Sequence, residues 1–211
     1  PVEAGLGGGS SNAATALYAA NTLCGNPASP EDLIEWSADL GSDITFFLGP
    51  TGSAYCTGRG EVIEPLDPLP NLRLYVVKPE MGLSTPLVFK TLAASGYSTL
   101  SERDPREDLL ASFVHGAPGP EDYVNDLEPP AFDLEPSLAA IKAKLLDLSP
   151  AAMMSGSGTS LFAVLSPDQS PDPDFPAAFE QACRDDLGLN VQLFDVCFAK
   201  RDGHDSWYAP P

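Results

Sequence analysis

A cluster of glycines near the start of the chain limits its structure more than any other feature. Residues 5–9 read Gly-Leu-Gly-Gly-Gly, and two serines follow them. Glycine adopts backbone conformations that other residues avoid, and it places no Cβ between the amides and an approaching group. The next stretch is rich in alanine, with apolar residues at helical spacing, and we expect Ser10 or Ser11 to be its N-cap. Its free amides and positive dipole end would favour a bound phosphate.

Three other interpretations of the glycines are less favourable. A flexible linker does not usually run into an N-cap and an apolar helix face. A P-loop requires Gly-Lys-Ser/Thr, and no lysine follows these glycines. A dinucleotide-binding fingerprint has a third glycine where Ser10 stands and an acidic residue about twenty positions later, and neither is present. The pattern therefore predicts an anion-binding loop of another kind.

The acidity of the chain restricts its partners. The 211 residues carry a formal net charge of −19, which would repel nucleic acid and anionic membranes. A polyanionic ligand would therefore need local devices such as backbone amides, a helix terminus and Mg²⁺. The four cysteines are scattered, without a Cys-x-x-Cys motif, and only two histidines are present. We therefore expect neither a protein metal site nor a disulfide framework.

The first part of the chain predicts helices followed by extended segments. Ser29, with Pro30 next and Asp32 three places on, predicts the start of a helix that ends at Gly41. Residues 42–49 are mostly β-branched, aromatic or otherwise apolar, which predicts a buried strand or extended segment. Asp43 lies at its start, and position alone leaves a cap or turn role as open as a catalytic one.

A strand is expected over residues 52–63, interrupted by a turn at 58–61, where Arg59 and Glu61 would form a surface ion pair. Prolines at 65, 68 and 70 then favour a domain boundary. We accordingly predict domains at residues 1–66 and 71–200 and a tail at 201–211. Because a phosphate loop normally follows a strand, we also expect further sequence upstream.

The second domain predicts an α+β arrangement of helices on an antiparallel sheet. Strands are expected at residues 72–78 and 191–199, with a hairpin over 151–165, and Ser84 is expected to cap a helix. Further helices are predicted at 136–148 and 175–187. Residues 125–132 read as an irregular acidic loop, in which turn chemistry would explain Asn125 and Asp126. The small-residue loop at 155–160 could present amides and hydroxyls to the glycine segment.

Several segments, taken in order, resemble a known kinase family. The glycine segment and residues 154–158 (Met-Ser-Gly-Ser-Gly) resemble two motifs of the galactokinase, homoserine kinase, mevalonate kinase and phosphomevalonate kinase superfamily. Residues 41–47, 58–61, 84–89 and 125–129 narrow the resemblance to the 4-diphosphocytidyl-2-C-methyl-D-erythritol kinases. Residues 54–61 and 125–132 are most similar to plant and algal plastid forms. The resemblance implies a two-domain α+β kinase fold and a plastid stroma location, with a bacterial cytoplasm as the alternative.

The resemblance also implies an activity and its residues. The activity is ATP- and Mg²⁺-dependent phosphorylation of the 2-hydroxyl of a CDP-linked methylerythritol, in non-mevalonate isoprenoid biosynthesis. Asp43 would accept the proton of that hydroxyl or orient it, Phe89 would stack on cytosine, and Thr85 would contact the substrate. The residues implied to support substrate from the second domain are Gly156, Ser157 and Gly158. Those implied to hold the triphosphate are Gly5, Leu6, Gly7, Gly8, Gly9, Ser10 and Ser11.

Two departures from the family pattern qualify these implications. Thr45 stands where the family commonly has proline, which would loosen the backbone beside Asp43. The family's first motif, with the lysine that partners the aspartate, has no counterpart, so we expect these 211 residues alone to be inactive or nearly so. A homoserine or mevalonate type of kinase and a non-catalytic nucleotide-binding module are the alternatives.

Overall fold

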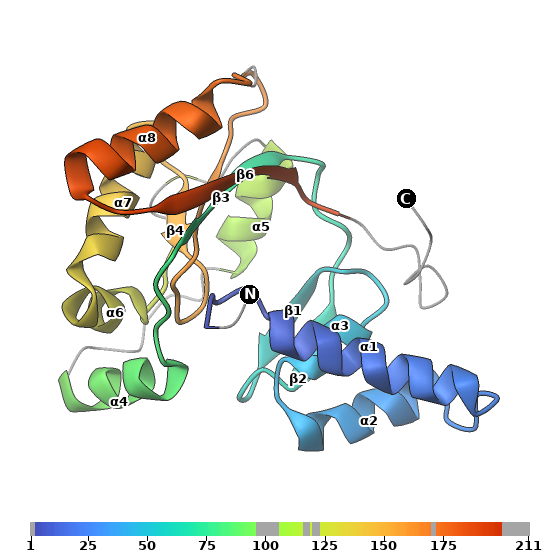
Figure 1. Cartoon of the computed structure of the whole chain (residues 1–211). Helices are drawn as coiled ribbons and strands as arrows, with labels where there is room; N and C mark the ends of the chain where they lie inside the picture. The colour runs from blue at the N-terminus through green and yellow to red at the C-terminus, as the bar shows by residue number, and fades with distance from the viewer. Residues whose placement is uncertain (1–2, 96–105, 116–118, 120–122, 170–171, 200–211) are drawn as a thin grey trace. The chain divides into compact units, whose positions relative to one another are not determined.

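Two compact units make up the structure (Figure 1). The computed structural model describes residues 3–95, 106–115, 119, 123–169 and 172–199, so the predicted tail at 201–211 lies outside it. Unit 1 combines Pro1–Leu6 with Pro70–Phe198, and unit 2 contains Gly7–Leu69. The glycine segment therefore passes from one unit to the other after Leu6. The domain limits at 1–66 and 71–200 stay a prediction.

Unit 1 is built on a four-stranded antiparallel sheet in the order β4-β5-β3-β6. The strands are β3 (Arg73–Pro79), β4 (Ala152–Met154), β5 (Leu161–Val164) and β6 (Val191–Cys197). Strand β3 pairs with β5 on one side, with Val76 opposite Phe162, and with β6 on the other, with Val76 opposite Phe194. The first strand of the unit in sequence therefore lies in the interior of the sheet, between β5 and β6.

Helices cover one face of this sheet (Figure 1). They include α7 (Pro136–Leu146) and α8 (Phe175–Leu187), whose apolar residues pack with the strands in a single core. The remaining helices of the unit are α4 (Thr85–Ser95), α5 (Arg106–His115) and α6 (Glu128–Leu134). Alternation along β3 places Tyr75 and Val77 in the core, where Leu138, Ile141 and Leu145 of α7 are fully buried. The predicted α+β class, with helices on an antiparallel sheet, is confirmed.

Unit 2 contains three helices and a hairpin among its described residues. Its elements are α1 (Gly8–Leu23), α2 (Pro30–Leu40), α3 (Ile44–Leu48), β1 (Ala54–Thr57) and β2 (Val62–Pro65). The predicted start of α2 is confirmed, because Ser29 and Asp32 form a reciprocal capping box with Pro30 in the first helical position. The turn between β1 and β2 carries the expected Arg59–Glu61 ion pair, with Nε and Oε1 3.9 Å apart.

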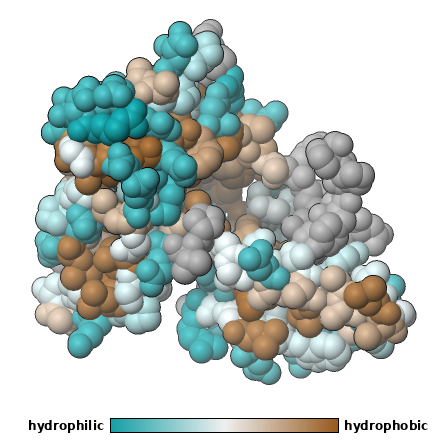
Figure 2. All heavy atoms as spheres, viewed as in Figure 1, coloured by the Kyte–Doolittle hydropathy of each residue, from teal (hydrophilic) through white to brown (hydrophobic). Residues whose placement is uncertain are grey.

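The surface of unit 2 is rich in exposed apolar side chains. Apolar residues show as brown spheres over α1 and α2 (Figure 2). Leu23 is 88% exposed, Leu40 65% and Trp36 52%, whereas the core of the unit is built around Ala14, Ala28, Leu33, Ile44 and Leu48. None of the helices in the described ranges is long and apolar enough to cross a membrane.

Three local predictions were wrong. Helix α1 begins at Gly8 with Gly7 as its N-cap, so Ser10 and Ser11 lie inside the first turn and do not cap it. Residues 44–48 form α3 and not a strand, because the short apolar run packs as a helical turn against α1 and α2. Periodicity alone does not separate a short buried helix from a strand. Helix α6 begins at Glu128, within the stretch predicted to be irregular.

Candidate functional site

The first turn of α1 presents main-chain donors without helical partners. Gly7 is the N-cap residue, with a φ of 63°, a left-handed conformation that glycine adopts without strain. The first helical hydrogen bond runs from the Ser11 amide to the Gly7 carbonyl oxygen at 2.8 Å. The amides of Gly8, Gly9 and Ser10 therefore have no partner in the preceding turn. A helix of 16 residues adds its dipole to these donors, so the turn suits an anion.

Helix α3 packs against α1, and the carboxylate of Asp43 directly precedes α3. A Cβ at Gly7 would lie 2.7 Å from Cζ of Phe47, so a side chain at position 7 would force the Phe47 ring to shift. Asp43 lies one turn before Phe47, directly before the first residue of α3. Unit 2 thus contains both the amide-rich turn and the aspartate on two helices that pack together.

Asp43 presents an exposed carboxylate beside the turn of the β1–β2 hairpin. A Cβ at Gly60 would lie 3.1 Å from Asp43 Oδ1, so the absence of a side chain there leaves room for the carboxylate. Its side chain does not cap α3, and among the described residues it has no hydrogen-bond or ion-pair partner. An exposed, unpartnered carboxylate at a fixed main-chain position is available to accept a proton from a ligand.

Thr45 secures the main chain next to Asp43. Its hydroxyl is buried and donates a hydrogen bond to the Ser42 carbonyl oxygen at 2.9 Å. The same hydroxyl lies 3.4 Å from the Gly60 carbonyl oxygen. The loosening expected from a threonine where the family commonly has proline is therefore offset by the hydrogen bond that Thr45 donates to Ser42.

Cys56 of β1 is the other reactive group near Asp43. Partial burial of the sulfur raises the pKa of the Cys56 thiol, and the negative charge of Asp43 raises it further. The thiol form consequently dominates at neutral pH, and a thiol is a poor nucleophile compared with a thiolate. Asp43, and not Cys56, is therefore the candidate for chemistry here.

In unit 1 the start of the glycine segment is hydrogen-bonded to the loop between β4 and β5. The Ser160 amide donates to the Ala4 carbonyl oxygen at 3.0 Å, and Ser155 Oγ donates to the Gly5 carbonyl oxygen at 2.7 Å. Gly5 has a φ of 69°, and a Cβ there would lie 2.1 Å from the Ser155 carbonyl oxygen. No other residue fits at position 5 without moving this main chain.

The same loop meets the start of α4. Thr85, the first residue of that helix, and Ser157 have their hydroxyl oxygens 2.7 Å apart. Phe89 lies one turn further along α4 and is 52% exposed, so its ring is available for stacking. Gly156 is exposed, whereas Ser157 and Gly158 are buried. Unit 1 therefore brings together the predicted substrate residues Thr85 and Ser157.

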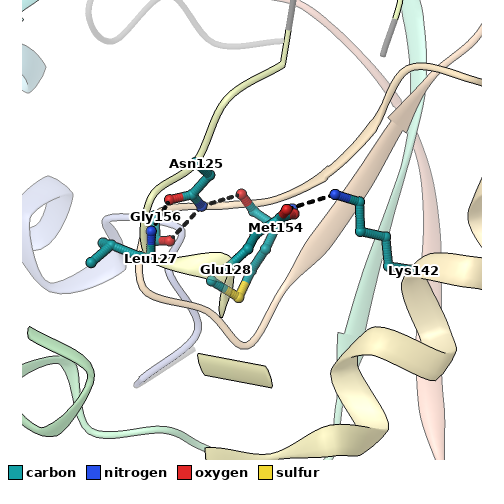
Figure 3. A network of polar contacts seen from close by, with 6 residues as sticks. All are labelled: Asn125, Leu127, Glu128, Lys142, Met154 and Gly156. Carbon is teal, nitrogen blue, oxygen red and sulfur yellow. Dashed lines mark hydrogen bonds and ion pairs between the residues drawn. The ribbon is translucent and has the colours of Figure 1, made fainter. Parts of the chain in front are cut away.

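A network of polar contacts holds the loop between β4 and β5 in place (Figure 3). Asn125 Nδ2 donates to the carbonyl oxygens of Met154 at 2.9 Å and Gly156 at 2.8 Å. Its Oδ1 accepts from the Leu127 amide at 3.0 Å, which is the turn chemistry that the sequence predicts. Asn125 thus closes its own turn and holds the β4–β5 loop at the same time.

Glu128 extends this network by contacting both Met154 and Lys142. Its Oε1 accepts from the Met154 amide at 2.7 Å, and its Oε2 pairs with Lys142 Nζ at 2.6 Å (Figure 3). Both side chains are mostly buried, 13% and 21% exposed. The motif from Asn125 to Glu128 stands out in the sequence, but Lys142 does not, because nothing in the spacing links a residue on α7 to that motif.

Comparisons with known proteins identify the family. The model for the GHMP kinases N terminal domain matches residues 1–49, and the model for GHMP kinases C terminal matches residues 112–182. A crystal structure of 4-(cytidine 5'-diphospho)-2C-methyl-D-erythritol kinase aligns with a TM-score of 0.69 and 31% identity, over 94% of this chain and 68% of that chain. The chain belongs to the GHMP kinase family.

Within the GHMP kinases, two curated relatives carry the same enzyme name. The chloroplastic 4-diphosphocytidyl-2-C-methyl-D-erythritol kinase of Oryza sativa subsp. japonica is 42% identical over all of this chain and 50% of its own length. The enzyme of that name from Protochlamydia amoebophila is 43% identical over 78% of this chain and 53% of its own length. The chain spans about half the length of the curated relatives it matches.

Substitution at two glycines tests the fastening of the glycine segment. Gly5→Ala places a Cβ against the Ser155 carbonyl oxygen in a left-handed conformation, so we expect the free energy of unfolding to fall by about 2 kcal/mol or more. Gly9 is helical, and a Cβ added there would meet nothing within 4 Å. Gly9→Ala is therefore the matched control, and it should leave stability unchanged or raise it by up to about 1 kcal/mol. Urea unfolding measures both, and equal losses would contradict the close approach at Gly5.

Removing the charge of Glu128 tests the network of Figure 3. Glu128→Gln leaves the largely buried Lys142 ammonium without its counter-charge, so we expect a loss of about 2 kcal/mol in the free energy of unfolding. The control is Asp186→Asn, which breaks the ion pair of Lys144 on the same helix as Lys142, where Asp186 is 61% exposed. That change should be much smaller, because solvent screens exposed pairs. A loss at Glu128 no larger than that at Asp186 would contradict a supporting role for the network.

Proposed function

We propose that this protein transfers the γ-phosphoryl group of ATP to the 2-hydroxyl of 4-diphosphocytidyl-2-C-methyl-D-erythritol. The observation that carries the proposal is the pairing, within unit 2, of free amides at the start of α1 with the exposed, unpartnered carboxylate of Asp43 beside α3. Phosphoryl transfer needs little covalent chemistry from the protein beyond positioning and charge stabilisation. Amides that hold the phosphates and a carboxylate that receives a proton supply those two requirements.

The triphosphate would be held by residues 5–11. The amides of Gly8, Gly9 and Ser10 lack helical partners, and the glycines leave the main chain open to close approach. Backbone donors bind phosphate without a basic patch, which suits a chain with a net charge of −19. Mg²⁺ bound together with the nucleotide would neutralise part of the phosphate charge. Among the described residues, no group of three or more His, Cys, Asp and Glu side chains could hold a metal ion.

Asp43 would act on the acceptor alcohol. The substrate oxygen bonds to the γ-phosphorus, the bond from that phosphorus to the bridging oxygen of ADP breaks, and the hydroxyl proton passes to the Asp43 carboxylate. The hydrogen bond from Thr45 to Ser42 keeps the main chain beside Asp43 in place. A fixed carboxylate lowers the entropy cost of reaching the reactive geometry.

The CDP-linked substrate would be bound by residues of unit 1. Phe89 offers an exposed ring for the cytosine base, and Thr85 and Ser157 offer adjacent hydroxyls, with Gly156 and Gly158 shaping the loop. The names of the relatives, at 42% and 43% identity, favour this substrate over others. The name of the Oryza relative includes the word chloroplastic, from which we infer a plastid location and a role in isoprenoid precursor synthesis.

Two alternatives make different predictions. A homoserine or mevalonate type of kinase would share the phosphate-binding turn but would have no use for a cytosine-stacking Phe89. CDP should therefore inhibit the proposed enzyme and leave such a kinase unaffected. A non-catalytic nucleotide-binding module would bind ATP without transferring its phosphate.

Asp43→Asn in the full-length protein tests the proposed proton acceptor. We expect kcat to fall by about 10²- to 10⁴-fold, because asparagine cannot accept the proton, while ATP affinity stays close to that of wild type. Asp39→Asn is the control, since Asp39 is an exposed carboxylate near the end of α2 and should leave kcat unchanged. Steady-state kinetics with ATP and the CDP-linked alcohol measure the effect. Undiminished turnover in Asp43→Asn would refute the assignment of Asp43.

Phe89→Ala tests the proposed base contact. Loss of stacking should raise KM for the CDP-linked alcohol about tenfold with little change in KM for ATP, since stacking on an aromatic ring contributes about 1–3 kcal/mol per base. Phe89→Tyr preserves the ring and should behave as wild type. Leu87→Ala removes another exposed apolar side chain of α4, 43% exposed, and should leave KM unchanged. Equal effects of Phe89→Ala and Leu87→Ala on KM would argue against stacking.

A further inference from the structure

A partly buried lysine, Lys78, lies near the end of β3. Lys78 Nζ donates to the carbonyl oxygens of Pro79 and, at 2.7 Å, Met81, and to Thr159 Oγ1 at 3.1 Å. The three donors of the ammonium group are thus all used, each on a neutral oxygen. In the part of the chain that the structure describes, no carboxylate forms an ion pair with it. The cation is held by carbonyl and hydroxyl oxygens.

Thr159 completes this arrangement. Its side chain is fully buried, and its hydroxyl donates to the Met81 carbonyl oxygen at 2.8 Å while it accepts from Lys78. Lys78, Thr159 and Met81 therefore form a closed triangle of hydrogen bonds. The triangle ties the segment after β3 to the loop between β4 and β5.

Apolar packing alone does not explain a partly buried lysine at this position. Burial lowers the pKa of Lys78, because removing the ammonium group from water disfavours its charged form. Apolar residues of similar size often stabilise such positions as well as or better than charged ones. What an ammonium group supplies here, and an apolar side chain does not, is simultaneous attachment of several main-chain and hydroxyl oxygens in one geometry.

Both segments tied by Lys78 lead to proposed substrate residues. The segment after Met81 runs into α4, which carries Thr85 and Phe89, and the segment before Thr159 carries Ser157. The hydroxyls of Thr85 and Ser157 lie 2.7 Å apart, which ties the two segments a second time. A shift at the Lys78 triangle would therefore move both substrate-facing groups.

We propose that Lys78 is a positioning residue, which with Thr159 holds α4 and the β4–β5 loop in the arrangement that recognises the cytidine-linked substrate. The proposal rests on the proposed function for the identity of that substrate. Lys78 itself does not touch substrate. It acts through Thr85, Phe89 and Ser157.

The test compares Lys78→Met, Thr159→Val and Thr159→Ser in the full-length protein. Lys78→Met keeps the length of the side chain without its donors, and Thr159→Val keeps the shape without the hydroxyl. Both should raise KM for the CDP-linked alcohol about tenfold and leave KM for ATP within about twofold. Thr159→Ser restores the hydroxyl and should bring KM close to the wild-type value. Failure of Thr159→Ser to recover KM, or an equal rise in both KM values, would overturn the proposal.

A stability control separates positioning from general loosening of unit 1. Leu145→Ala opens the fully buried core under the sheet without touching the triangle. It should lower the midpoint of urea unfolding and leave the ratio of the two KM values unchanged. A change in that ratio for Leu145→Ala equal to that for Lys78→Met would also overturn the proposal.

Amide hydrogen exchange provides a readout that does not depend on the reaction. Lys78→Met should speed exchange in residues 80–84 and 156–160 and leave α8 protected as in wild type. Unchanged exchange in these two segments would contradict the inference about Lys78. If the wild-type protein does not phosphorylate the CDP-linked alcohol, the proposed function is wrong, and so is the substrate role of Lys78. Faster exchange in Lys78→Met would still establish that Lys78 fixes the two segments.

Discussion

Close main-chain approach at Gly5 is the constraint on which the arrangement of unit 1 depends. The Gly5 carbonyl accepts from Ser155, and the space that a Cβ would fill is already occupied by the Ser155 carbonyl oxygen. The loop between β4 and β5 is thereby fixed to the start of the glycine segment. Asn125 holds the same loop through Met154 and Gly156. A small-residue loop without regular structure is thus made rigid by contacts on several sides.

In this acidic chain, neutral polar groups make the main contacts with charged groups at the sites of interest. The start of α1 offers amides and a helix dipole, and the ammonium group of Lys78 at the end of β3 is surrounded by carbonyl and hydroxyl oxygens. The chain has a net charge of −19, so its composition does not favour a free basic patch for a triphosphate. Local dipoles can bind an anion without altering the overall charge, because backbone amides carry no net charge.

Much of the fold follows from local patterns in the sequence. The capping box of Ser29 and Asp32, the strand at 73–79 and the hairpin around the β4–β5 loop each have a short-range signal, and each is present. The helix at residues 44–48 was missed because its five residues are too few for periodicity to distinguish it from a strand. The N-cap of α1 was misplaced because the left-handed conformation of Gly7 competes with the usual preference for serine.

The candidate site was predictable only in part, for a physical reason. Glycines, Asp43 and Phe89 stand in short motifs that resemble those of a family, so their positions can be proposed from the sequence. Lys78 and Thr159 are 81 residues apart in the chain, and Lys142 pairs with Glu128 of a different helix, so no spacing rule brings these partners together. The hydrogen bond between Lys78 and Thr159 depends on the folded sheet, in which β3 lies beside β5.

The most direct test of the proposed function is the product of the full-length protein incubated with ATP, Mg²⁺ and 4-diphosphocytidyl-2-C-methyl-D-erythritol. Phosphorus NMR should show one new phosphomonoester on the CDP-linked alcohol for each ADP formed. Phosphorylation of homoserine or mevalonate in its place, or ADP formation without a phosphomonoester, would contradict the proposal.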